Sequence, residues 1–229
     1  MTKQNETRHY PFADADLTPN AKGLSTSINR DMTDFAGRNI TNVTLADLEI
    51  LIDDFDNMPT DKELLGEWMA ATDVKNKTME DVKIAIRPIR NMAELVYKGK
   101  GKYTSFGFED MAHMSGNDLY QLVKRVVRVG TKCLAELSTQ GLTQAQLTDL
   151  QNMATLLDTQ IDNAEDKQET RDLETQQRIQ KGNALWDKMV ELASIGKSIY
   201  VDTNPAKYND YVLTTTPPSD APPTETPVK

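Results

Sequence analysis

NALWDKMVELASIGKSIYVDTNPAKYNDY, residues 183–211, decides the predicted fold. The stretch has the pattern of a helix end, a stop at Gly196 and a closing segment with three tyrosines. The apolar residues Leu185, Met189, Leu192, Gly196 and Ile199 recur at steps of four and three, which is typical of a helix-bundle seam. Trp186, Met189, Leu192 and Tyr200 are therefore expected in a packed core.

A similar stretch lies about a hundred residues earlier, in residues 86–111. At an offset of 97 positions, Leu95, Gly99 and Tyr103 coincide with Leu192, Gly196 and Tyr200. A fixed offset with small slips at loops is what an internal duplication predicts. Chance resemblance between amphipathic helices is the alternative. Pro88 opposite Leu185 and a helix interruption near residues 72–78 are departures from exact repetition.

The remaining chain reads as a series of amphipathic helices, which predicts an all-α antiparallel bundle built from a duplicated three-helix unit. Thr44 is expected to cap a helix with acids on its outer face. The next helix presents Leu64, Leu65, Trp68, Met69 and Ala71 as one apolar set. Pro88 predicts a kink in the helix that follows. Residues 164–181 are helix-prone but almost entirely polar, which fits a solvated extension or a connector.

These patterns divide the chain into four predicted parts. Residues 1–22 form a flexible N-terminal arm, 23–111 the first helical repeat and 112–213 the second, with both repeats packed as one domain. Residues 214–229, rich in Pro and Thr, form a disordered tail. Residues 99–116 are the longest central loop.

Composition limits the function. The 229 residues carry a formal net charge of −9, which disfavours sequence-independent nucleic-acid binding. The only basic group, Lys124, Arg125 and Arg128 with nearby loop lysines, reads as a solvated face. No apolar run reaches the length of a membrane span, and no secretory signal is visible. A cytoplasmic location follows as an expectation, with export by a leaderless route left open.

Residues with catalytic or ligand-binding potential are few. Cys133, the single cysteine, lies in an apolar helix and reads as a small buried residue. His113 lies near Glu109 and Asp110 in the central loop, where an acid–histidine pair could do acid–base chemistry or bind a metal. No second core histidine, P-loop or nucleophile motif accompanies it. We therefore expect no catalytic, cofactor-binding or metal-binding residue, although a concave pocket around His113 would favour an enzyme.

The second half of the chain resembles a family. Residues 142–213 combine a capped helix, a long helix and the ending Asn204-Pro205-x-x-Tyr208-x-x-Tyr211. This order resembles a group of uncharacterised helical proteins of Bacteroidetes bacteria. The resemblance implies an all-helical fold and an interaction role, and it transfers no catalytic residue.

These observations predict a non-enzymatic helical structural or interaction protein that contacts a protein partner or a second copy of itself. The alternative is a component or cargo of a phage or contractile-injection particle, or a helical pore-forming protein.

Overall fold

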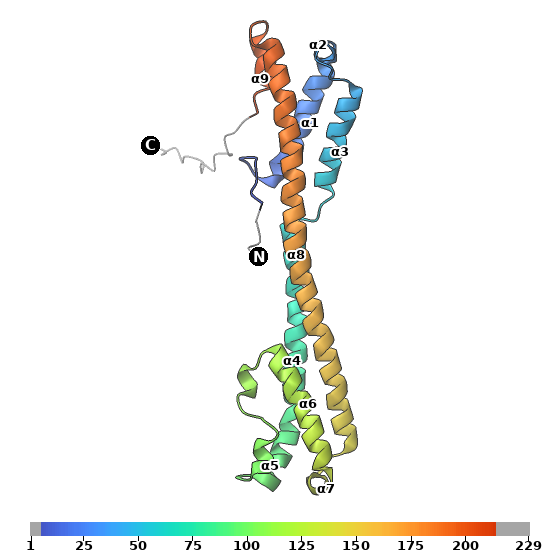
Figure 1. Ribbon diagram of the computed structural model, residues 1–229, viewed down its shortest axis with the longest axis vertical. Helices are drawn as coiled ribbons and strands as arrows, with labels where there is room; N and C mark the ends of the chain where they lie inside the picture. Colours follow the sequence, from blue (N-terminus) through green and yellow to red (C-terminus); the bar gives the residue numbers. More distant parts are fainter. Residues whose placement is uncertain (1–5, 214–229) are drawn as a thin grey trace, which may run out of the picture. The chain divides into compact units, whose positions relative to one another are not determined.

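The computed structural model describes residues 6–213 and has an all-α fold (Figure 1). The described residues contain α-helices and short 3-10 helices and no β-strand. The helices of the first half are α1 (Asp14–Arg30), α2 (Met32–Ala36), α3 (Asn42–Asp56), α4 (Asp61–Tyr97) and α5 (Gly101–Thr104). The others are η1 (Met111–His113), α6 (Gly116–Lys132), α7 (Leu134–Leu137), η2 (Ser138–Gln140), α8 (Gln144–Tyr200) and α9 (Pro205–Asp210). The predicted helical bundle is confirmed, and the predicted tail at 214–229 lies outside the described residues.

The described residues form two compact units, each with its own core. The central unit is residues 61–172, and the terminal unit combines residues 6–60 with residues 173–213. These limits differ from the expected repeats 23–111 and 112–213. The difference arises because α4 packs with α6 and the first half of α8, whereas α1 and α3 pack with the second half of α8, which is continuous over 57 residues. Its polar middle contains helix formers and no proline, so the helix is not interrupted there.

The apolar helix faces expected from the sequence are buried in two separate cores, one in each unit. α4, α6 and the first half of α8 enclose the central core, whose members include Val82, Ile86, Leu119, Leu122, Leu147 and Leu157. α1, α3 and the second half of α8 enclose the terminal core, whose members include Leu17, Ile28, Leu48, Phe55, Leu185 and Leu192.

We expect a fragment of residues 61–172 to fold alone, because every buried member of the central core lies within it. A fragment of residues 23–111 contains parts of both cores and completes neither, so it should stay largely unfolded. Far-UV circular dichroism with urea titration distinguishes the two. A cooperative transition for 23–111 and none for 61–172 would contradict the observed division.

Part of the expected N-terminal arm is ordered structure. α1 begins at Asp14, and Tyr10 is buried with its hydroxyl donating to Asp14 Oδ1 at 2.8 Å. A Cβ on Gly182 would lie 2.8 Å from the Tyr10 hydroxyl oxygen, so the glycine allows this segment to approach α8 closely. The backbone N–H of His9 also donates to Asn183 Oδ1 at 2.8 Å. The segment from His9 is therefore docked rather than free.

Three local expectations are corrected. Thr41, not Thr44, is the N-cap of α3, and Thr44 serves as the third helical residue of a capping box. α4 is continuous through residues 72–78, where the sequence predicts an interruption, and Pro88 lies inside it. Gly196 lies inside α8, which continues to Tyr200. Gly99, by contrast, ends α4 with a φ of +73° that favours glycine.

Matching local structures recur 102 positions apart along the chain. Asp31 breaks the helix between α1 and α2, and Cys133 breaks it between α6 and α7. Asn39 and Gly141 both have a left-handed φ. Thr41 and Thr143 then each pair with the residue three positions later, at the first turn of α3 and α8 respectively.

The closing segments correspond at a longer spacing. Lys102-Tyr103-x-x-Phe106 and Lys207-Tyr208-x-x-Tyr211 lie 105 positions apart, after the ends of α4 and α8. At the expected offset of 97, Leu95 is 76 % exposed and Leu192 is 0 % exposed, whereas Ile89 and Trp186 are both buried.

Candidate functional site

The aromatic ending of the chain closes the terminal unit. Asn204 caps α9, since its side-chain Oδ1 accepts from the Lys207 N–H at 3.1 Å, and Pro205 occupies the first helical position. α9 carries Tyr211 back against α8, where the ring is fully buried beside Gly196. The Asn-Pro-x-x-Tyr-x-x-Tyr pattern is therefore a cap, a helix start and a buried anchor.

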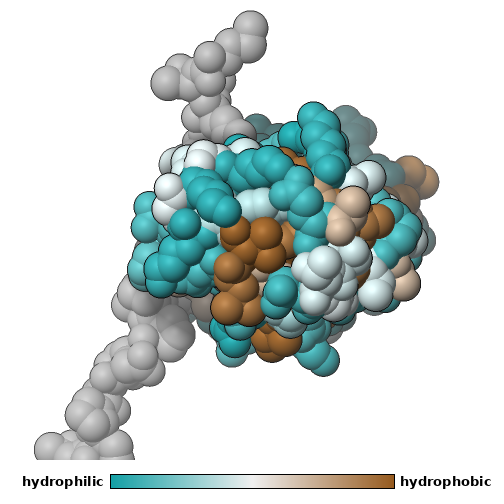
Figure 2. All heavy atoms as spheres, turned by 90° about the horizontal axis from the view of Figure 1, so that it is seen from below, coloured by the Kyte–Doolittle hydropathy of each residue, from teal (hydrophilic) through white to brown (hydrophobic). Residues whose placement is uncertain are grey.

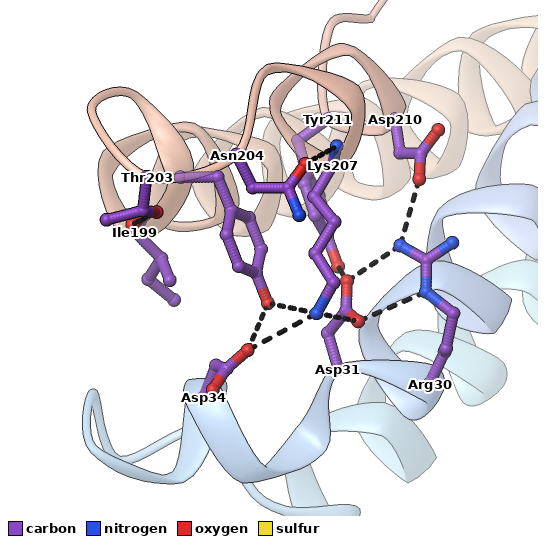
Figure 3. A network of polar contacts seen from close by, with 10 residues as sticks. Arg30, Asp31, Asp34, Ile199, Thr203, Asn204, Lys207, Asp210 and Tyr211 are labelled. Carbon is purple, nitrogen blue, oxygen red and sulfur yellow. Dashed lines mark hydrogen bonds and ion pairs between the residues drawn. The ribbon is translucent and has the colours of Figure 1, made fainter.

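A polar network attaches this ending to α1 and α2 (Figure 3). Its centre is Asp31, whose side chain is 1 % exposed. The Tyr211 hydroxyl donates to Asp31 Oδ2 at 2.9 Å, and Lys207 Nζ lies 2.8 Å from Asp31 Oδ1. Arg30 donates through Nε and Nη2 to the two carboxylate oxygens at 3.1 and 2.7 Å. Arg30 Nη2 also donates to Asp210 Oδ2 at 2.9 Å.

The charges in this network stabilise the ionised carboxylate. Hydrogen bonds from Arg30 hold the pKa of Asp31 well below its usual range, and those from Lys207 and Tyr211 act in the same direction against the effect of burial. Hydrogen bonding to Asp31 raises the pKa of Lys207. No buried side-chain nitrogen or oxygen of the described residues lacks a hydrogen-bond partner, so we interpret the network as a structural closure of the terminal unit.

A second carboxylate extends the closure. The Tyr200 hydroxyl donates to Asp34 Oδ2 at 2.6 Å. Burial, followed by this hydrogen bond, raises the pKa of Tyr200 to about 12. Burial also raises the pKa of Tyr211. Both phenols are therefore held in the protonated form in the folded protein.

Raised tyrosine pKa values predict alkaline destabilisation. The folded pKa of Tyr200, about 12, exceeds the usual value of 10.0, so its contribution to stability is complete below pH 10 and is lost as the pH rises through 12. Urea midpoints should fall between pH 10 and 12, and Tyr200→Phe should reduce this fall. Tyr208→Phe, a half-buried tyrosine of α9, is the control. Identical pH profiles for wild type and Tyr200→Phe would contradict the prediction.

The central unit has a simpler closure at the corresponding place. The Tyr97 hydroxyl donates to Glu136 Oε2 at 2.8 Å, and Lys102 pairs with the other oxygen of the same carboxylate. Hydrogen bonding from Lys102, then from Tyr97, lowers the pKa of Glu136. Cys133 is buried, as predicted, at the position that corresponds to Asp31.

His113 lies at a hollow of about 400 Å³ in the central unit. Glu109, Asp110, Asp118 and Arg125 also line it. These five side chains and that of Gln121, which also lines the hollow, are exposed, and the His113 backbone N–H donates to Asp110 O at 2.9 Å. The structure thus brings together the acids and the histidine that the sequence singled out. Because these groups are hydrated, the hollow lacks the desolvated environment in which acid–base groups are usually activated.

A second hollow of the central unit, of about 270 Å³, lies between α4 and α8 at the beginning of α6. Trp68 and Thr72 of α4, Ile161 and Ala164 of α8, and Gly116 of α6 are among its lining residues. The Arg171 guanidinium lies 4.9 Å from the centre of the Trp68 ring. Two neighbours of Trp68 in the apolar set of this helix, Leu65 and Met69, are 40 % and 52 % exposed.

On the face shown in Figure 2, hydrophilic side chains predominate and hydrophobic residues form smaller separate groups. Within residues 6–213, no group of three or more His, Cys, Asp or Glu side chains is placed to hold a metal ion. No helix of the described chain is both long and apolar enough to cross a membrane.

Comparison of the chain with protein-family models, curated proteins and solved structures finds no significant match. The fold and these sites define an all-α protein with two packed closures, hollows at His113 and Trp68 in the central unit, and a hollow of about 280 Å³ beside Trp186 in the terminal unit. The resemblance of residues 142–213 to helical proteins of Bacteroidetes stays a prediction.

Sequence reasoning identified the tyrosines of the closure but missed Arg30, Asp31 and Lys207. The repeated Lys-Tyr-x-x-aromatic pattern is a signal that could have identified Lys207. Asp31 had no such signal, because an acid at a helix end is usually exposed. The exposure of Leu65 and Met69 was also missed, since their spacing is that of a buried face.

Proposed function

We propose that this chain is a non-enzymatic helical interaction protein that acts by presenting helix faces to a protein partner. The observation that carries the proposal is an apolar strip of α4, formed by the exposed Leu65 and Met69 and by the half-buried Trp68, which lines a hollow. Large apolar side chains gathered next to a hollow are typical of protein-binding surfaces. The hydrated His113 hollow offers no comparable support for an enzyme.

Site-specific crosslinking tests this function. A photoreactive amino acid replaces Met69 in one sample and Ile84, a 55 % exposed residue of α4, in a matched control. In cells of the natural source, we expect the chain to form a discrete crosslinked product from position 69 and none from position 84. Light scattering of the purified chain separates a partner from a second copy. A strict monomer that gives no crosslink from position 69 or from any other exposed apolar position would contradict the function.

We also propose that the chain is an internal duplication of a three-helix unit. In this arrangement the third helix of each copy packs with the first two helices of the other copy. Support comes from the matching features at a spacing of 102 positions and from the two closures. Each compact unit then combines the first two helices of one repeat with the third helix of the other: α1 and α3 with the end of α8, and α6 and the start of α8 with α4. Exchange of equivalent elements is a low-cost route to such an arrangement.

A further inference from the structure

The hollow at Trp68 is the end of a groove that α6 fills over the rest of its length. α6 packs against α4 and α8 in the central unit (Figure 1). The cap of α6, Ser115, and its first residue, Gly116, line the hollow, so the N-terminal end of α6 lies there. Beyond this point α4 and α8 still pair with each other, as the 2.7 Å ion pair between Lys167 Nζ and Glu67 Oε2 shows. Along this stretch, the place beside α4 and α8 that α6 occupies elsewhere is open.

The face of α4 that turns toward this position changes from covered to exposed. Residues 65 and 83 lie five helical turns apart on one face. Lys83 is 9 % exposed, and its Nζ contacts Ala112 O at 3.3 Å in the segment before α6. Leu65 on the same face is 40 % exposed, and Met69 one turn on is 52 % exposed. The open part of the groove therefore has an apolar wall on α4.

The opposite wall, on α8, carries acids, and two cations stand at the hollow as well: Lys75 of α4 lines it, and the Arg171 guanidinium lies over the Trp68 ring. Glu165 lines the hollow. Asp158 and Asp162 lie seven and three positions before Glu165, and Glu169 lies four positions after it. At these spacings all three share the helix face of Glu165. The helix that occupies the rest of the groove has the opposite charge. α6 contains Lys124, Arg125, Arg128 and Lys132 and a single acid, Asp118.

We propose that the open part of this groove binds an amphipathic helix of a partner protein, with an apolar face toward Leu65, Trp68 and Met69 and Lys or Arg residues along the edge that faces Glu165 and Glu169. This inference rests on the proposed interaction function and names the partner's chemistry. The docked helix lies in line with α6 and completes a third layer. The apolar wall supplies the burial that stabilises the complex, and the charged edge selects the partner.

Two synthetic peptides of about 18 residues, or five helical turns, test the proposal on the full chain. Both carry leucine at heptad positions a and d, and they carry either lysine or glutamate at e and g. Fluorescence anisotropy measures binding. We expect the lysine peptide to bind at least about tenfold more tightly than the glutamate peptide. The double change Leu65→Gln and Met69→Gln should weaken the lysine peptide about tenfold, and Glu165→Lys with Glu169→Lys should reverse the preference.

Matched controls separate the groove from general charge attraction. Ile84→Gln removes an exposed apolar side chain from another face of α4, and Asp53→Lys reverses an exposed acid of α3; neither should change the dissociation constant more than about twofold. Equal binding of both peptides, or unchanged binding after the Leu65 and Met69 changes, would overturn the proposal. A dimer that dissociates on those changes would assign the groove to a second copy and overturn it too. If position 69 gives crosslinks but neither peptide binds, the proposed interaction function is supported. The proposal that the partner presents a basic amphipathic helix is then rejected.

Discussion

Gly196→Ala is expected to lower the free energy of unfolding of the terminal unit by about 2 kcal/mol. A Cβ at position 196 would lie 2.4 Å from atoms of the Tyr211 ring, closer than atoms can approach without displacement. Tyr211 is fully buried and carries the hydroxyl bound to Asp31, so displacing the ring disturbs packing and the polar network together. Overpacking of this kind costs about 1–3 kcal/mol, of which the better helix propensity of alanine offsets a part.

Gly23→Ala is the matched control for this change. Gly23 also lies in a helix of the terminal unit, and a Cβ there meets no atom within 4 Å. Alanine should therefore stabilise the protein by about 0.5–1 kcal/mol. Each compact unit contains one tryptophan, so the fluorescence of Trp186 in a Trp68→Phe background reports on the terminal unit during urea titration. Equal effects of the two substitutions would show that Tyr211 does not occupy the space beside Gly196.

Asp31→Ala is expected to cost about 3 kcal/mol, because it removes the buried acceptor shared by Arg30, Lys207 and Tyr211. Loss of one partner from a buried charged network typically costs 3–5 kcal/mol. The buried Tyr211 hydroxyl would be left without its acceptor, whereas Lys207, with one third of its side chain exposed, can be hydrated. Asp53→Ala, at an exposed position of α3, should change stability by less than about 0.5 kcal/mol.

The same change predicts an altered response to acid. The pKa of Asp31 is lower in the folded protein than in the unfolded chain, where it is about 3.9. Its contribution is therefore present above pH 4 and is lost as the pH falls below that value toward the folded pKa. The stability difference between wild type and Asp31→Ala should shrink below pH 4 in urea titrations. A difference that stays constant from pH 7 to pH 3 or lower would contradict an ionised Asp31 in the closure.

Several elements were predictable because their signals are local. The seam of Leu185, Met189 and Leu192 follows from helical spacing, and all three residues are buried. The burial of Cys133 follows from its apolar surroundings in the sequence. The expected closing segment after Tyr200 is present, and within it α9 begins at Pro205, next to its cap Asn204. Each of these features depends on contacts or capping within a few turns of one helix.

The groove at Trp68 illustrates what local patterns could not provide. Leu64, Leu65, Trp68 and Met69 read as one apolar face, but Leu64 is 6 % exposed and Met69 is 52 % exposed. Whether a side chain is covered depends on where α6 begins relative to α4, and residues more than forty positions apart in the sequence determine that. The spacing of an amphipathic helix gives the direction of its apolar face, and it contains no information on how far a partner helix extends.

The sequence by itself determined the all-α class, most helix positions, the apolar seams and the importance of residues 183–211. Only the tertiary structure decided which helices share a core, that Gly196 accommodates Tyr211 instead of ending a helix, and that Asp31 is the buried centre of the closure. The physical reason is that helix formation follows from local propensity and periodicity, whereas the pairing of helix faces depends on long-range packing. Many amphipathic faces in this chain have similar apolar spacing, so only the complete set of contacts selects their partners.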